Sequence, residues 1–246
     1  MNTNKLRFIR LLFLALSFTF YLLPCASQTL APGAPGKDAQ WATAGKQAVG
    51  TSVSLESRVW FTLANGVMTE VYYPDVTVAN THLLQFVVVN PKTKKVETEL
   101  DDAIHQIRAT RPDSLSFQQI NTAKSGEWEI TKIYTTDVEN NSILINISVD
   151  SNNKDLKFYL YYDPSLSNSG MRDIAWNDGN TLLTKDNNNT SAVLIGKTRD
   201  GSFKQSEKTL KVSNGFYQTN DGLEQLKKVG EISSNPRADN GNVVQI

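Results

Sequence analysis

The sequence is poor in the residues on which metal centres and thiol chemistry depend. Its 246 residues include one cysteine, Cys25, and two histidines, His82 and His105. One cysteine excludes an internal disulfide framework and a cysteine-based zinc site, and two histidines exclude a His-rich metal centre. We therefore expect no metal ion and no other cofactor.

Net charge is absent too. The count of Lys+Arg is 25 and that of Asp+Glu is also 25. Because nucleic-acid-binding proteins normally carry a clustered basic face, this balance gives no reason to expect a nucleic-acid partner. An apolar share of 39% argues against disorder, and the length suits one large all-β domain or two smaller ones.

Long apolar runs are missing except near the N-terminus. Residues 11–23 are apolar apart from one serine and one threonine, and three basic residues but no acidic one precede them. This run is shorter than the ~20 residues that a membrane-spanning helix needs, and the small residues Ala26 and Ser27 follow it. The sequence predicts a cleaved signal peptide over residues 1–27, a secreted or periplasmic location, and no membrane association after cleavage.

A second interpretation of the leader is a lipoprotein signal. Leu22-Leu23-Pro24-Cys25 would then be the lipid-acceptor box, with Cys25 modified. Pro24 fits such a box poorly, so signal-peptide cleavage after Ser27 is preferred, which leaves residues 28–246 as the mature chain.

Short strands are predicted along most of the remaining chain. Alternating or β-branched and aromatic runs are separated by Gly, Asn, Asp and Pro, and Asn65-Gly66 is a strong hairpin signal. The expected strands are 58–64, 67–73, 83–89, 104–110, 115–120, 128–134, 143–149, 156–162, 181–185, 192–197 and 209–212, with a late strand at 242–246. Residues 221–229 are the one modest helix candidate. This pattern predicts an all-β, antiparallel sandwich.

Three of these strands allow finer predictions. In 128–134 the apolar positions change phase between Ile130 and Ile133, which suggests a bulge or a strand that switches faces. Alternation in 143–149 indicates one face in the core. The aromatic run 156–162 indicates a central strand covered on both faces.

Catalytic motifs are not found. There is no Gly-x-Ser-x-Gly elbow and no Gly-rich turn between a strand and a helix. A carboxylate pair for glycoside hydrolysis could come from Asp101, Asp102, Asp113 or Asp163, but the sequence places no two of them across a sugar bond. Asp101-Asp102 is interpreted as the polar end of a strand. We therefore assign no catalytic residue.

Aromatic side chains offer another kind of site, because their rings stack on the apolar faces of sugars. Trp60, Phe61 and Phe158 lie inside predicted strands and are interpreted as core residues. Trp41 and Trp176 are predicted to lie in loops that contain Gly or Asp, and they are the candidate carbohydrate contacts.

An ordered series of motifs resembles the N-terminal domain of the bacterial glucoamylases and glucodextranases, glycoside hydrolase family 15. The series includes the hairpin around Asn65-Gly66, then Tyr72-Tyr73-Pro74, and it spans nearly all of the mature chain. Its segments are residues 31–36, 41, 49–52, 57–66, 69–74, 132–137, 161–166, 213–215, 221–223 and 241–244. Each segment is weak by itself, whereas the ordered series is specific.

The resemblance implies a large antiparallel supersandwich like that of galactose mutarotase. In the family, a helical α/α barrel follows this sandwich and carries the two catalytic glutamates of an inverting exo-hydrolysis of α-glucans. No segment here resembles that barrel, so no catalytic role is carried over. We expect residues 28–246 to be a sandwich that is incomplete at its C-terminus.

Three functions are considered at this point. The first is the non-catalytic accessory domain of a secreted exo-α-glucan hydrolase, with an α-glucan, an oligosaccharide or a glucoamylase catalytic barrel as partner. The second is a stand-alone carbohydrate-binding module that uses Trp41 or Trp176. The third, an aldose epimerase, rests on fold shape alone and would need a histidine close to a glutamate.

Overall fold

A computed structural model describes residues 29–199, 202–205 and 210–246. The predicted signal peptide, residues 1–27, lies outside this part of the chain. The strands are β1 (Ala48–Gly50), β2 (Trp60–Ala64), β3 (Val67–Tyr72), β4 (Thr81–Asn90), β5 (Lys95–Thr98), β6 (Ala103–Ala109), β7 (Phe117–Ala123), β8 (Trp128–Asp137), β9 (Ser142–Ser151), β10 (Lys157–Pro164), β11 (Asp173–Asp178), β12 (Thr181–Lys185), β13 (Thr190–Leu194), β14 (Gly196–Arg199), β15 (Ser202–Gln205), β16 (Asn214–Phe216), β17 (Arg237–Gly241) and β18 (Val243–Gln245). The helices are α2 (Glu99–Asp102), the short 3₁₀ helix η2 (Leu166–Asn168) and α3 (Gly222–Val229).

An eight-stranded sheet forms the centre of the fold. Its order is β1-β2-β3-β4-β10-β18-β16, and β5 pairs with part of β4. All of its strand pairs are antiparallel. The all-β antiparallel fold expected from the sequence is thus confirmed.

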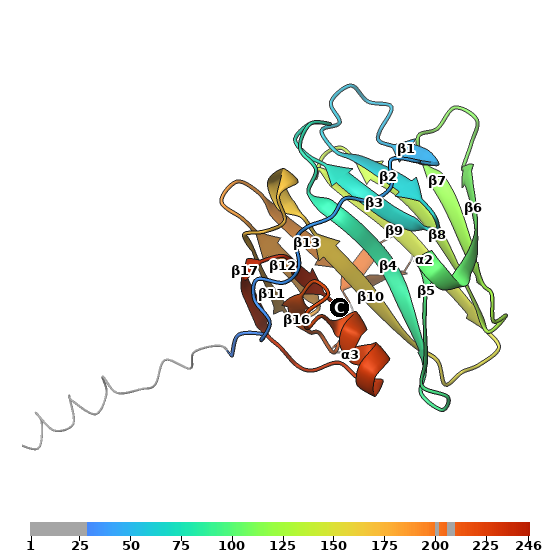
Figure 1. The fold of residues 1–246 in the computed structure, drawn as a ribbon. Helices are drawn as coiled ribbons and strands as arrows, with labels where there is room; N and C mark the ends of the chain where they lie inside the picture. Colours follow the sequence, from blue (N-terminus) through green and yellow to red (C-terminus); the bar gives the residue numbers. More distant parts are fainter. Residues whose placement is uncertain (1–28, 200–201, 206–209) are drawn as a thin grey trace, which may run out of the picture.

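Two four-stranded sheets lie side by side on one face of the central sheet (Figure 1). We call them the β6–β9 sheet, in the order β6-β7-β8-β9, and the β11 sheet, in the order β13-β12-β11-β17. A single apolar cluster joins all three sheets, because it contains Tyr134 of β8 and Leu182 of β12 together with Leu84 and Tyr162 of the central sheet. The second layer of the sandwich is therefore divided, with β9 and β13 at its inner edges (Figure 1).

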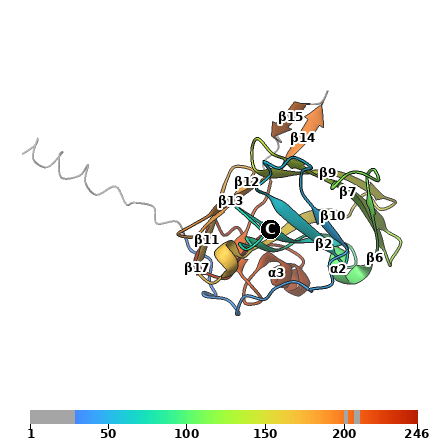
Figure 2. The ribbon, with the colours of Figure 1, turned by 90° about the horizontal axis from the view of Figure 1, so that it is seen from above.

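The other face of the central sheet is covered in part by helix α3. Leu226 of α3 packs with Val87, Tyr161 and Ile246 in an apolar cluster. Seen from above, α2 and α3 lie along this side of the central strands (Figure 2). Helix α3 begins at the N-cap Asp221, whose side chain accepts the N–H of Glu224. Because both faces of β10 are covered, the central position predicted for 156–162 is confirmed.

Most of the predicted strands are present, within a few residues at their ends. Three expectations were wrong. Asp101 and Asp102 belong to helix α2, not to the end of a strand. The strand expected at 192–197 is divided into β13 and β14. Residues 210–212 are not in a strand, and residue 209 lies outside the described part.

The bulge expected in β8 is also wrong. Strand β8 pairs with β7 and β9 in unbroken register, so side chains alternate regularly along it. Ile130, Lys132 and Tyr134 all point into the sandwich and are completely buried. Lys132 occupies an inward position where an alternating pattern would have an apolar residue. The apolar residue Ile133 occupies the outward position next to it, and together these two residues explain the apparent change of phase.

Strand β9 forms a long edge. It pairs with β8 over ten successive residues, and no other described strand pairs with it. The one-sided pattern predicted for 143–149 is confirmed for the first half of the strand, where Ile143 and Ile145 of the inward-facing row pack into the core. Farther along the same row, Ile147 and Val149 remain 40% and 43% exposed.

Candidate functional site

A buried ion pair lies between the central sheet and the β6–β9 sheet. The ammonium nitrogen of Lys132 is 2.8 Å from a carboxylate oxygen of Glu99, and neither side chain is exposed. Glu99 also accepts the backbone N–H of Phe86 at 2.7 Å and an amide hydrogen of Asn121. Removing two charges from water is costly, so this pair depends on its mutual attraction and on these additional hydrogen bonds.

The same polar cluster holds the turn between β2 and β3. Lys132 Nζ and Asn121 Nδ2 donate to the carbonyl oxygen of Gly66 at 3.2 and 2.6 Å. Gly66 has φ +81°, and a Cβ there would lie 2.2 Å from Nδ1 of His105. The predicted Asn65-Gly66 hairpin is therefore confirmed, and its glycine is needed both for the left-handed conformation and for close contact with the opposite sheet.

Burial shifts the titratable groups of this cluster. It lowers the pKa of Lys132, against the opposing attraction of Glu99, and it lowers the pKa of His105. It raises the pKa of the Tyr134 hydroxyl well above its usual value. Such a collection of shifted groups has the composition of an acid–base site. Because Lys132, Glu99 and Tyr134 are fully buried, however, a sugar could not reach them, and we interpret the cluster as structural.

A second group of buried acids lies where β10 ends. Nδ1 of His82 is 2.8 Å from Oδ2 of Asp163, and Asp163 is 1% exposed. Its other oxygen, Oδ1, is buried without a hydrogen-bond partner among the described residues. Burial raises the pKa of this carboxyl, while His82 acts in the opposite direction.

Asp173 and Asp221 belong to the same region, and each accepts backbone hydrogen bonds. Asp221 caps helix α3, and Asp173 accepts the N–H of Leu166 at 3.1 Å. Burial raises the pKa of both carboxyls. With smaller contributions from the nearby carboxylates of Asp186 and Asp163, the pKa of Asp173 reaches about 7. A glycosidase needs two carboxyl groups in contact with the sugar bond, and these three acids are buried away from solvent.

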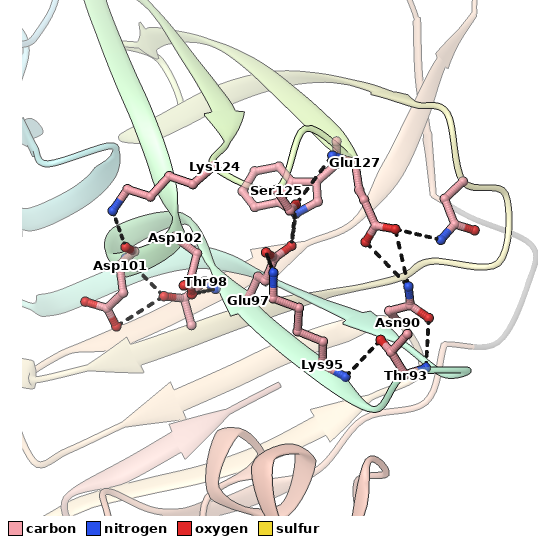
Figure 3. A network of polar contacts seen from close by, with 12 residues as sticks. Asn90, Thr93, Lys95, Glu97, Thr98, Asp101, Asp102, Lys124, Ser125 and Glu127 are labelled. Atoms are coloured by element: carbon pink, nitrogen blue, oxygen red, sulfur yellow. Dashed lines mark hydrogen bonds and ion pairs between the residues drawn. The ribbon is translucent and has the colours of Figure 1, made fainter.

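A third polar network closes one end of the sandwich (Figure 3). Glu97 accepts hydrogen bonds from the Trp128 indole at 2.9 Å and from Ser125 at 3.0 Å, and it pairs with Lys95. Beside it, the carboxylate of Glu127 faces the side-chain amide of Asn90 (Figure 3). The network connects the β4–β5 turn to the β7–β8 turn, so its acids have structural partners.

Trp176 lies in strand β11, so the loop predicted for it is wrong. It faces away from the central sheet, because its neighbour Ala175 is fully buried on the inner face. Lys185 Nζ and Arg237 Cζ lie 5.9 and 6.0 Å from the centroid of its ring. These cations come from β12 and β17, the strands on either side, and they cover part of the indole surface that a sugar would use.

Trp41 lies in the irregular segment before β1, as predicted, and is 44% exposed. The two tryptophans that the sequence analysis grouped together are thus on different elements, and the structure does not bring them into one site. Sequence analysis missed the Glu99–Lys132 cluster altogether; the one available signal was a lysine inside the alternation of 128–134.

The part of the chain that the structure describes shows neither a metal-binding cluster nor a membrane-spanning helix. No three His, Cys, Asp or Glu side chains there are arranged to hold a metal ion. Within residues 29–199, 202–205 and 210–246, no helix is long and apolar enough to cross a membrane.

The fold and its buried polar clusters place the chain in the class of large antiparallel β-sandwich domains. More narrowly, it belongs to the family described as glucodextranase, domain N, whose model matches residues 31–246. The resemblance found in the sequence is confirmed.

Two relatives support this membership. The chain is 34% identical over 217 residues to a glucoamylase of Clostridium sp. (strain G0005), a match that covers 86% of this chain and 30% of the relative. It is also similar to the crystal structure of a bacterial glucoamylase complexed with acarbose, with TM-score 0.76 and 31% identity, over 88% of this chain and 32% of that one. The chain spans about a third of the length of these relatives.

Proposed function

We propose that this protein is the non-catalytic accessory domain of a secreted glucoamylase- or glucodextranase-like exo-hydrolase of α-glucans. The observation that carries the proposal is the match of residues 31–246 to domain N of the family, in relatives about three times as long as the matched region. The domain would act by packing against a catalytic domain and supporting its fold. The predicted leader supports secretion into the periplasm or beyond the cell.

The placement of the acids agrees with a non-catalytic role. Asp163, Asp173 and Asp221 are at most 2% exposed, and Glu99 is fully buried. Asp113 is exposed and forms an ion pair with Arg111, with Nε and Oδ1 3.6 Å apart. Retaining and inverting glycosidases both require two carboxyl groups on either side of an accessible sugar bond. None of the carboxyls named here forms such a pair on an accessible surface.

The first prediction concerns hydrolysis. The purified chain, incubated alone with maltodextrins or dextran, is expected to release glucose only at the rate of a buffer blank. Glucose can be measured by a coupled oxidase assay, with a complete bacterial glucoamylase as positive control. Release above the blank that follows the protein through two purification steps would contradict the proposal.

A stand-alone carbohydrate-binding module is the second candidate, and the 44% exposure of Trp41 favours it. If Trp41 stacks on a sugar, Trp41→Ala should raise the Kd for maltoheptaose roughly two- to tenfold, the change expected for loss of one stacking contact. Isothermal titration calorimetry measures this change.

Trp176→Ala is the matched control for that experiment. Lys185 and Arg237 already cover part of the Trp176 ring, so the variant should leave the Kd unchanged. No binding of maltoheptaose by the wild-type chain at millimolar concentration would remove the module as a candidate.

A further inference from the structure

Two loops project together from one end of the central sheet. Residues 51–59 lead into β2 and residues 73–80 follow β3. Because Trp60 at the start of β2 pairs with Tyr72 at the end of β3, both loops leave the same end of the hairpin. Figure 1 shows this end at the top of the molecule, opposite helix α3.

The first loop is held by its own hydrogen bonds and presents aliphatic side chains to solvent. Thr51 Oγ1 donates to the carbonyl oxygen of Val59 at 2.7 Å, and the N–H of Ser57 donates to the carbonyl oxygen of Ser54 at 3.2 Å. At its tip, Val53 is 76% exposed and Leu55 is fully exposed. The loop's hydrogen bonds thus hold Leu55 where its side chain packs against no residue of the described part of the chain.

The second loop is built in the same way. Asp75 Oδ1 accepts the backbone N–H of Thr77 at 2.8 Å and its hydroxyl at 2.6 Å. The side-chain amide of Asn80 donates to the carbonyl oxygen of Tyr73 at 2.8 Å. Val76, between these contacts, is 57% exposed. A second rigid turn therefore carries an exposed aliphatic residue beside the first.

Aromatic side chains line the strand ends between the two tips. Trp60 and Tyr72 are cross-strand neighbours, and both are half-buried. Tyr73 follows, with the guanidinium carbon of Arg58 5.3 Å from the centroid of its ring. Tryptophan, tyrosine and arginine are the residues most often found at the energetic centres of protein interfaces.

We infer that this surface is the docking site for the catalytic domain. The loop-end patch consists of Val53, Leu55, Arg58, Trp60, Tyr73 and Val76. The inference rests on the proposed function and adds to it the face through which the two domains meet. The proposed partner is the part of such an enzyme that lies outside the matched region, which makes up about two thirds of the length of the two relatives.

The chemistry of the patch suits a protein better than a sugar. Two valines and a leucine at the tips offer no hydrogen bonds to hydroxyl groups, whereas they would fill apolar pockets on a folded partner. Because hydrogen bonds already order these loops, their aliphatic residues lose little conformational entropy on binding. Exposed apolar groups gathered beside half-buried aromatic rings are also a recognised mark of protein interaction surfaces.

The test uses this chain and, as a separate protein, the portion of the Clostridium sp. glucoamylase outside its matched region. Biolayer interferometry measures the Kd of wild-type chain for that portion. Leu55→Asp and Val76→Asp should each raise the Kd at least about tenfold, because each places a charge in an apolar contact. Both side chains are exposed, so neither variant should change the thermal unfolding of the chain.

Val229→Asp is the matched control. Val229 is 62% exposed at the end of α3, far from the patch, and the variant should change the Kd less than about twofold. As a second readout, residues 31–246 replace the matched region within the complete Clostridium enzyme. There Leu55→Asp, but not Val229→Asp, should lower the temperature at which hydrolysis is lost.

The outcomes separate this inference from the proposed function. Wild-type binding or an active chimera, with Leu55→Asp and Val76→Asp behaving as wild type, would overturn the patch and leave the accessory role standing. If the wild-type chain does not bind and the chimera is also inactive, both the inference and the proposed function are overturned. A third outcome would assign the patch to a sugar instead. In that case Tyr73→Ala abolishes maltoheptaose binding, while Leu55→Asp and Val76→Asp leave the Kd for the protein partner unchanged.

Discussion

Glu99→Gln is expected to lower the free energy of unfolding by about 3–5 kcal/mol, because it leaves the Lys132 ammonium buried without a counter-charge. Glutamine has nearly the same size, and its one amide oxygen can still accept the N–H of Phe86. Its NH2 group then faces the amide of Asn121, so the loss reports the missing charge together with one hydrogen bond. Urea unfolding at pH 7, followed by tryptophan fluorescence, measures the change.

Two variants control this experiment. Asp113→Asn breaks a pair whose side chains are mostly exposed, and it should cost less than about 1 kcal/mol. Adding Lys132→Met to Glu99→Gln should restore part of the stability, because an apolar side chain then replaces the unpaired charge. Similar small losses for Glu99→Gln and Asp113→Asn would show that the buried pair is not essential to the sandwich.

The domain is also expected to become less stable between pH 5 and pH 8. Burial raises the pKa of Asp173 to about 7, so the folded protein binds a proton that the unfolded chain has already released. This contribution is fully present below the unfolded pKa and is lost as the pH rises through about 7. A shift of that size corresponds to at most about 4 kcal/mol. Burial also raises the pKa of Asp163 and of Asp221, and these shifts act in the same direction. The pKa of His105, which burial lowers, acts in the opposite direction, but on one group against three.

Asp173→Asn tests the assignment of this pH dependence. The amide oxygen can still accept the N–H of Leu166, but the side chain no longer titrates. Unfolding free energies measured by urea at pH 5, 6, 7 and 8 should fall less steeply for this variant than for wild type. Asp178→Asn, at the exposed end of the same strand, should follow the wild-type curve. Parallel curves for all three proteins would refute the role of Asp173.

Elements with strong local signals could be predicted from the sequence. Helix α3 was found from its spaced leucines and terminal lysines, and Asp221 at its start and Gly230 at its end cap it as such patterns require. The β2–β3 hairpin followed from Asn65-Gly66. In these segments, neighbouring residues already favour the backbone conformation that the tertiary contacts then stabilise.

Elements whose conformation depends on residues distant in the sequence could not be predicted in this way. The regular strand β8 was predicted to bulge because Lys132 occupies a core position, and its partner Glu99 lies 33 residues earlier. Trp176 was placed in a loop because Asn and Asp surround it, whereas β12 and β17 hold this segment as the third strand of a sheet. The loop-end patch was also missed, since two loops separated by a hairpin meet only after the strands pair.

The hydrogen bonds to Gly66 bear on the order in which the chain assembles. The β2–β3 hairpin is local and could form within microseconds. Its turn is finished only when Asn121 and Lys132 reach it, 55 and 66 residues later in the sequence. Closing such large loops is slow, and the buried charges are compensated only at that step. We therefore expect docking of the two layers and formation of the buried hydrogen bonds and ion pair to occur together, late in folding.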